Sequence, residues 1–81
     1  MNKKAISISH KMKGLLDDDY TLYDDGTILH EYDKHTYPGG QNLIENLTVA
    51  DLSNAVKQRL LEAASDDDKE LVRKTLNLEN G

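Results

Sequence analysis

The chain contains no cysteine, tryptophan or phenylalanine among its 81 residues, and it has a single proline. Without cysteine, neither disulfide bonds nor thiolate metal sites can form, so stability must come from packing, helix caps or a partner subunit. The sequence also lacks the apolar run that a signal peptide requires, and no segment approaches the roughly 20 apolar residues of a membrane span. We therefore expect a cytoplasmic protein that does not bind membranes.

Negative charge is missing from the first part of the chain and dominates the rest. Residues 1–16 carry four lysines and no acid, whereas all 15 acidic residues follow residue 16, together with only six basic ones. The acidic remainder repels a polyanion, so we expect no direct binding to nucleic acid. An acidic surface favours a protein partner with a basic surface instead.

The length and an apolar content of 37% suit one domain that spans residues 1–81. Residues 4–12 alternate apolar and polar, with Ile6 and Ile8 on one side and Ser7 and Ser9 on the other, which predicts a half-buried strand. The aspartates at 17–19 break this pattern, and we expect them to form a solvated loop.

Two β-rich runs flank the turn residues Asp24, Asp25 and Gly26 and predict a hairpin with strands at 20–24 and 27–33.

The hairpin has two candidate registers. A two-residue turn pairs Leu22 with Leu29, whereas a three-residue loop with Gly26 in the left-handed conformation pairs Leu22 with Ile28. We favour the three-residue loop because it gathers Tyr20, Leu22 and Ile28 on one face and leaves only Leu29 misplaced.

The second half of the chain predicts helices. The turn residues at 37–40 should end the sheet. We then expect Thr48 to be the N-cap of a helix over 49–64 and Ser65 to be the N-cap of a helix over 66–76. The prediction is an α+β fold of order βββαα, with a three-stranded antiparallel sheet and two helices packed on one face of it.

Potential cation ligands crowd into residues 23–35, but their spacing argues against a site. The fragment at 24–28 resembles the centre of a calcium-binding EF-hand loop, yet three of the acidic positions that such a loop needs are occupied by other residues. On a regular strand, Asp33 and His35 share one face and His30 lies on the other. We predict no metal and no cofactor, with weak metal binding as a minor alternative.

No nucleophile and base, and no pair of carboxylates in an apolar setting, stands out in the sequence, so we do not expect an enzyme. Tyrosine is the only aromatic residue type in the chain, and it is enriched at protein interfaces. We predict a binding surface made of the hairpin tyrosines and the neighbouring acids: Tyr20, Tyr23, Tyr32, Tyr37, Asp17, Asp18, Asp19, Asp24, Asp25 and Glu31.

The resulting hypothesis is a small acidic module that binds another protein. It would act as an inhibitor or modulator that docks on a basic surface of a nucleic-acid-handling or defence enzyme, in the manner of anti-restriction or anti-CRISPR proteins of phages and mobile elements. The alternative is a self-associating protein, such as a homodimer, or a subunit of a larger complex.

Overall fold

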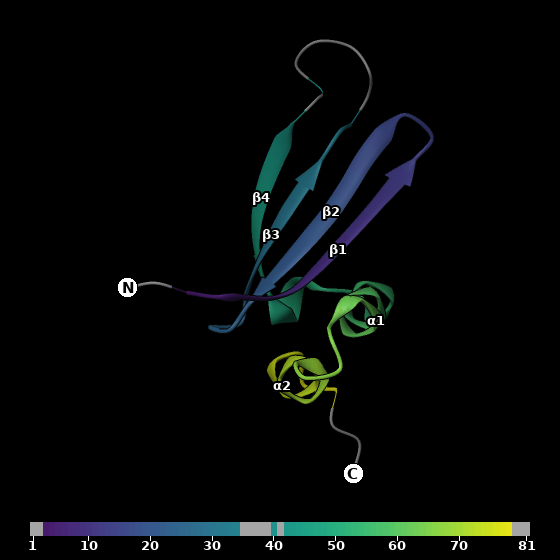
Figure 1. Ribbon diagram of the computed structural model, residues 1–81. Helices are drawn as coiled ribbons and strands as arrows, with labels where there is room; N and C mark the ends of the chain where they lie inside the picture. The colour runs from purple at the N-terminus through teal and green to yellow at the C-terminus, as the bar shows by residue number, and fades with distance from the viewer. Residues whose placement is uncertain (1–2, 35–39, 41, 79–81) are drawn as a thin grey trace.

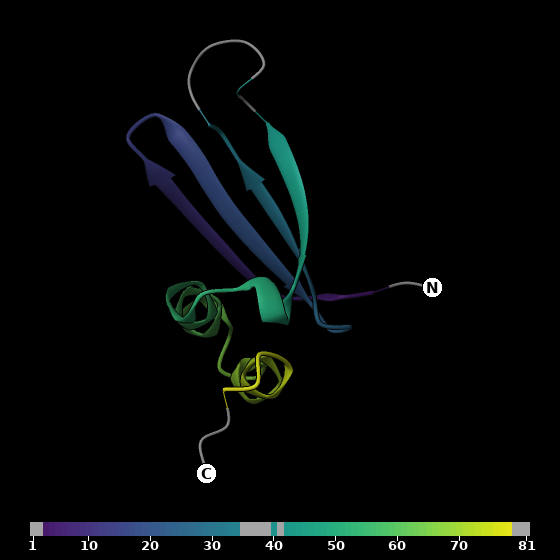
Figure 2. The ribbon, with the colours of Figure 1, turned by 180° about the vertical axis from the view of Figure 1, so that it is seen from behind.

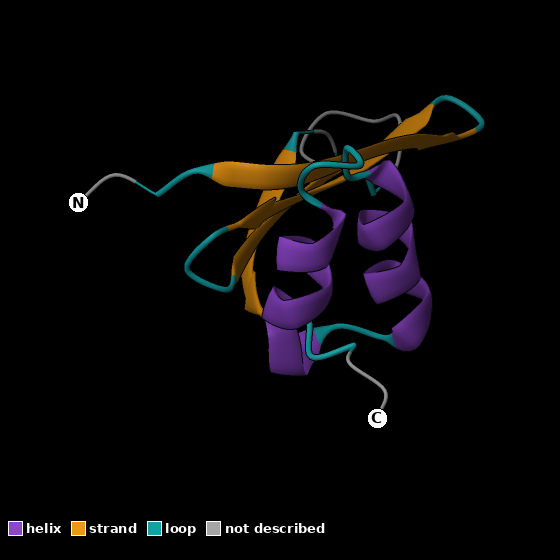
Figure 3. Ribbon diagram, turned by 60° about the horizontal axis from the view of Figure 1, so that its bottom comes forward, coloured by secondary structure: helices purple, strands orange, loops and turns teal. Residues whose placement is uncertain are grey.

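The computed structural model describes residues 3–34, 40 and 42–78. Within them the chain is α+β, with an antiparallel sheet followed by two α-helices, as the sequence predicts (Figure 1). Four strands pair in chain order, and both helices lie on the same face of the sheet (Figure 3). The elements are β1 (Ala5–Lys13), β2 (Leu16–Tyr23), β3 (Thr27–Tyr32), β4 (Leu43–Thr48), the 3-10 turn η1 (Val49–Asp51), α1 (Asn54–Ala63) and α2 (Lys69–Thr75).

The predicted number of strands is wrong, because the sheet does not end before residue 40. The segment Leu43–Thr48 adds as β4 along β3, where Leu47 faces Ile28 and Leu43 faces Tyr32. Ile44 and Asn46 lie on one face of β4 and Leu47 lies on the other, so apolar and polar residues do not alternate regularly along this segment. Most of the predicted turn at 37–40 lies outside the described residues.

The predicted loop at 17–19 is also wrong, since all three aspartates lie within β2. Only a two-residue turn, Gly14 and Leu15, separates Lys13 from Leu16, and Gly14 adopts the positive φ of +66° that such turns favour. The strand tolerates three consecutive aspartates because neighbouring side chains point to opposite faces of the sheet. On each face the carboxylates reach hydrogen-bond partners or solvent. The β1–β2 hairpin therefore extends well beyond the helices (Figure 1).

The second hairpin has the register of the three-residue loop. Leu22 faces Ile28, Tyr20 faces His30, and Gly26 has a φ of +86°. This confirms the preferred interpretation and places Leu29 on the face opposite to Leu22.

An irregularity near the start of β1 changes which side chains are buried. The pairing with β2 shifts between Ala5 and Ser7, so the bulge turns both Ile6 and Ser7 towards the helices. Ile8 is consequently 60% exposed, whereas Ser9 is buried. The expectation that both isoleucines share the inner side of this strand is wrong.

Both helices begin later than predicted. The Asp51 carboxylate accepts a hydrogen bond from the Thr48 main-chain N–H, but this pair closes only η1. The cap of α1 is Ser53, whose hydroxyl accepts from the Val56 N–H. Residues 66–68 form a turn ahead of α2, for which Asp68 rather than Ser65 is the N-cap residue.

The core lies between the helices and one end of the sheet. Its fully buried side chains are Leu22, Ile28, Leu60, Val72 and Leu76. The Ser7 hydroxyl also donates to the Leu60 carbonyl, which ties β1 to α1. The helices therefore cover one end of one sheet face, as the view from behind also shows (Figure 2).

Candidate functional site

The face of the sheet that points away from the helices is its most distinctive surface. Among the described residues, no helix packs on this side (Figure 3). The register places one row of side chains from each strand here, and we call this surface the open face. Its main members are Ile8, His10, Met12, Asp17, Asp19, Leu29, Glu31, Asp33, Ile44 and Asn46.

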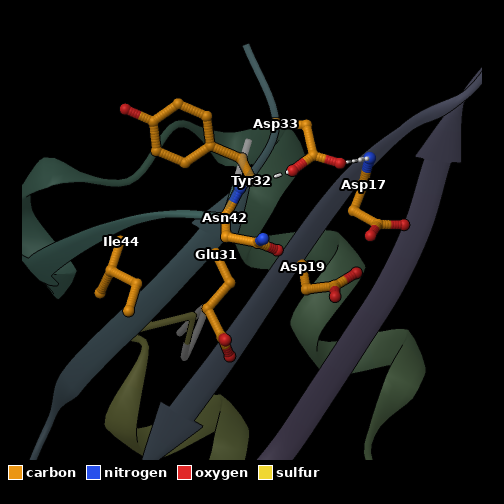
Figure 4. Close-up of a pocket in the computed structure, with 7 residues that line it drawn as sticks. All are labelled: Asp17, Asp19, Glu31, Tyr32, Asp33, Asn42 and Ile44. Carbon is orange, nitrogen blue, oxygen red and sulfur yellow. Dashed lines mark hydrogen bonds between the residues drawn. The ribbon is translucent and has the colours of Figure 1, made fainter. Parts of the chain in front are cut away.

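Carboxylates gather at the end of the open face that is furthest from the helices. Asp17, Asp19, Glu31 and Asp33 line a pocket of about 150 Å³, together with Tyr32, Asn42 and Ile44 (Figure 4). The carboxylates of Asp19 and Glu31 project from neighbouring strands, which pair these two residues directly. Like charges directly opposite each other disfavour a sheet. His10 offsets part of this cost, because its Nδ1 atom lies within hydrogen-bonding distance of Asp19.

Asp33 has a structural part in this pocket. Its carboxylate accepts hydrogen bonds from the main-chain N–H groups of Asn42, at 2.8 Å, and Asp17, at 3.1 Å. These two bonds hold the pKa of Asp33 below its usual value. The side chain therefore links the ends of β2 and β4 across β3 and remains charged at neutral pH.

Exposed apolar side chains surround the acids. Ile8 is 60% exposed, Met12 55% and Ile44 64%, although all three are large hydrophobic residues. Ile8 and Met12 lie on β1 and Ile44 on β4, so they flank the carboxylates on both sides. Apolar groups beside charges are typical of surfaces that contact other proteins.

A single lysine lies at the opposite end of the open face. The Lys3 ammonium is 4.4 Å from the centre of the Tyr23 ring and 3.1 Å from the Thr27 hydroxyl, to which it donates. A cation over an aromatic ring is stabilised by the ring quadrupole. The open face is therefore acidic at the far end, and Lys3 places a positive charge at the end nearest the helices.

The other face of the sheet holds a polar network that extends from α1 across β1 and β2 to side chains of β3 and β4. Arg59 donates from Nη1 to the Asp18 carboxylate and from Nη2 to the Asp18 carbonyl, both at 2.9 Å, and from Nε to the Ser9 hydroxyl at 3.1 Å. His30 Nε2 is 2.7 Å from the same carboxylate, and Nδ1 is 3.3 Å from Glu45. Because carboxylates only accept hydrogen bonds, His30 can donate to both of them only as the imidazolium.

Burial strongly affects the acid at the centre of this network. Desolvation is the largest contribution and raises the pKa of Asp18, but the hydrogen bonds and charges of His30 and Arg59 together outweigh it. The pKa of Asp18 therefore lies below its usual value. The carboxylate is ionised and fully engaged within the fold.

Two tyrosines enclose His30. The Tyr20 and His30 rings stack with centroids 4.1 Å apart, and the His30 and Tyr32 rings with centroids 4.4 Å apart. The Arg59 guanidinium lies 4.9 Å from the centre of the Tyr20 ring. Burial and the nearby Asp18 charge raise the pKa of Tyr20. This stack stabilises the middle of the sheet on the face that carries the helices.

Comparison with protein-family models, curated proteins and solved structures finds no match for this chain. Its surfaces are therefore the basis for any functional assignment. Neither of the two described helices is long and apolar enough to cross a bilayer.

The residues predicted to bind a partner do not form one surface. Asp17, Asp19 and Glu31 meet on the open face, whereas Asp18 and Tyr20 are engaged in the network on the other side.

The other predicted residues have mainly structural roles. Tyr32 borders the acidic pocket, but its ring points away from the carboxylates (Figure 4). Asp25 accepts hydrogen bonds from the Thr27 hydroxyl and N–H, which lower its pKa, and Asp24 accepts from the Lys4 N–H. Both acids therefore stabilise the turn and the start of β1. Tyr37 lies outside the described residues, and so does His35.

The sequence interpretation missed several residues that the open face brings together. Asp33 was considered only as a metal ligand, and Ile8, Met12 and Ile44 were not considered for binding at all. Regular alternation would place Met12 and Ile8 on the same side as the buried Ile6, so their exposure depends on the bulge, and that of Ile44 depends on the unexpected β4. Within the described residues, no three histidine or acidic side chains are placed to hold a metal ion.

Proposed function

We propose that this chain is a small, non-enzymatic protein-binding module that docks its open face on a basic surface of a partner protein. One observation carries the proposal: four carboxylates and three exposed large apolar side chains share a sheet face on which, among the described residues, no helix packs. The apolar groups supply contact area and the acids supply orientation and rapid association.

The partner class that fits best is an enzyme with a basic groove for nucleic acid. Asp17, Asp19 and Glu31 repeat a negative charge across adjacent strands, as phosphates repeat along a strand of nucleic acid. A basic groove selected for phosphates would also attract this face. We propose that the chain acts as an inhibitor or modulator by occupying such a groove.

Self-association through the open face is less favourable than binding to a basic partner. Two copies packed in parallel would bring the acidic ends of their sheets together, and unpaired like charges at an interface cost several kcal/mol. Antiparallel packing would set the four carboxylates of each copy against Lys3 of the other, which is too little positive charge to balance them. Light scattering at micromolar concentration measures this directly. A monomer is the expected result.

The test compares two matched triple variants in quantitative capture of the partner from extracts of the native host. The face variant, Asp17→Asn, Asp19→Asn and Glu31→Gln, neutralises three of the four acids of the open face and keeps the structural Asp33. The control variant, Asp66→Asn, Asp67→Asn and Glu70→Gln, removes the same charge from exposed acids at and before α2. We expect the face variant to bind at least about tenfold more weakly and the control variant to bind as the original chain does.

Ionic strength gives a second readout in the same experiment. Binding by the original chain should weaken steeply between low salt and about 0.5 M salt, where charges are screened within a few ångströms. Equal binding by both variants, or affinity that salt leaves unchanged, would contradict docking through the acidic face.

A further inference from the structure

The two edge strands of the sheet differ in how well they are protected against additional pairing. An edge strand exposes a row of unpaired N–H and C=O groups, and proteins usually block such edges with lysines, prolines, bulges or covering elements. β1 has two of these devices, namely the bulge at Ile6 and the exposed Lys11. Addition of another strand at β1 is therefore disfavoured.

β4 forms the other edge and, as far as the described residues extend, has none of these protective features. Its six residues include no lysine, arginine or proline, and its pairing with β3 runs without irregularity from Thr48 to Leu43. Among the described elements, β3 is the only one with which β4 makes extensive contact (Figure 1). In this antiparallel pair, alternate residues of β4 direct their N–H and C=O groups away from β3.

The surroundings of this edge define the chemistry of a strand that could add to it. Glu45, with a side chain that is 51% exposed, lies on β4 itself, and Glu31 lies directly opposite Ile44 on β3. Asp19 is the next residue across the same row. An added strand would thus meet negative charge on both faces of the sheet, and Ile44 would offer it an apolar contact.

We propose that β4 accepts an extended, basic segment of the partner as a fifth strand. This inference rests on the proposed function and extends it, because it assigns the partner's contact to main-chain pairing at one edge as well as to charge. Main-chain hydrogen bonds would supply affinity, and lysine or arginine side chains of the segment would select the acidic row. A second copy of the chain is a poorer occupant because its basic strand, β1, is protected by the bulge.

The probe is a synthetic peptide of alternating lysine and valine with the six-residue length of β4. Two further peptides carry N-methyl groups, one on every lysine and the other on every valine. In a strand, alternate N–H groups point to opposite edges, so only one methylation pattern removes the donors that face β4. We expect that pattern to weaken binding at least about tenfold and the other to leave it within about threefold.

Two matched variants identify the edge. Ile44→Lys and Ile8→Lys each place one lysine on the open face at an exposed isoleucine, on β4 and β1 respectively. Both change the charge equally, so a difference between them reports the edge that the peptide uses. We expect Ile44→Lys to weaken peptide binding at least about tenfold and Ile8→Lys by less than about threefold. Amide exchange should show new protection in β4 and none in β1.

Equal binding by the two methylated peptides, equal effects of the two lysine variants, or failure of the unmethylated peptide to bind would each overturn strand addition. The triple face variant separates this failure from failure of the proposed function. If both methylated peptides bind equally and the face variant abolishes their binding, docking by charge stands and strand addition does not. If the face variant also leaves binding unchanged, neither proposal survives.

Discussion

Replacing Arg59 with leucine tests how strongly the polar network joins the sheet to α1. The substitution keeps an apolar side chain against Tyr20 but removes three hydrogen bonds, two of them to Asp18. Among the described residues, it also leaves the Asp18 carboxylate with His30 as its remaining side-chain partner. The loss should therefore exceed that of an ordinary surface ion pair.

The magnitude follows from burial. Removing one partner of a buried ion pair costs about 3 to 5 kcal/mol, whereas exposed pairs contribute about 1 kcal/mol or less. The Arg59 and Asp18 side chains are 13% and 15% exposed, so water screens the pair only in part. We expect a loss of about 2 to 3 kcal/mol, out of a total of roughly 4 to 12 kcal/mol for a domain of this size.

Urea unfolding followed by circular dichroism measures this loss. With a slope of about 1 kcal/mol per molar urea, the midpoint should fall by about 2 M. Arg73→Leu, in which an exposed arginine of α2 is replaced, should lose less than about 1 kcal/mol. Combined with Asp18→Asn in a double-mutant cycle, Arg59→Leu should show a coupling of about 1 to 3 kcal/mol. A loss below about 1 kcal/mol with no coupling would refute the reasoning.

Three further perturbations test other parts of the fold. Because the folded-state pKa of Asp18 is lowered, the stability that it contributes is complete above about pH 4 and is lost as pH falls through that lower value. Between about pH 5 and 3, Asp18→Asn should consequently lose less stability than the original chain, and an equal loss would contradict this. Gly26→Ala should lower the free energy of unfolding by about 1 to 2 kcal/mol, because the φ of +86° at this position strains any residue with a Cβ atom. Nothing lies within 4 Å of the added Cβ, so a steric clash does not contribute. Unchanged stability in thermal unfolding would count against the left-handed turn. Leu60→Ala should lower the free energy of unfolding by about 2 to 5 kcal/mol, because Leu60 is fully buried. Leu71→Ala, at a position that is 45% exposed, should lower it by less than about 1 kcal/mol. Similar losses in the two variants would contradict the assigned core.

Structural features that depend only on residues close together in the sequence were predictable from local sequence signals. The hairpin register was predictable because Gly26 supplies the left-handed position and because a one-residue slip would exchange the faces of Ile28 and Leu29. The class of fold and the order of strands before helices followed from periodicity and turn residues. These features need no knowledge of distant contacts.

Features that depend on distant partners were not predictable from local patterns. Three consecutive aspartates favour a loop by themselves, yet Arg59 and His30 lie 41 and 12 residues from Asp18 and supply the contacts that keep the segment in β2. The segment Leu43–Thr48 becomes a strand only because the edge of β3 is available. The open face depends on both errors, since β2 provides two of its four carboxylates, Asp17 and Asp19, and β4 provides one of its two exposed isoleucines, Ile44.

The helix caps also show that a local sequence signal does not determine where a helix begins. Thr48 and Asp51 form the local pair that the sequence indicates, but the chain leaves η1 at Leu52 with an extended conformation. Ser53 then starts α1, which carries Leu60 to the core. A capping signal thus fixes a turn, whereas packing decides whether a helix continues from it.

Site-specific photo-crosslinking most directly tests the claim that the open face contacts a basic partner. A photoreactive residue is placed at Ile8 or Ile44 on the open face, or at exposed Glu62 on α1 as the control. Docking through the open face predicts crosslinks to one basic protein from both isoleucine positions, none from Glu62, and loss of the crosslinks at about 0.5 M salt. Crosslinks to the partner from Glu62 but from neither isoleucine position would contradict the proposed function.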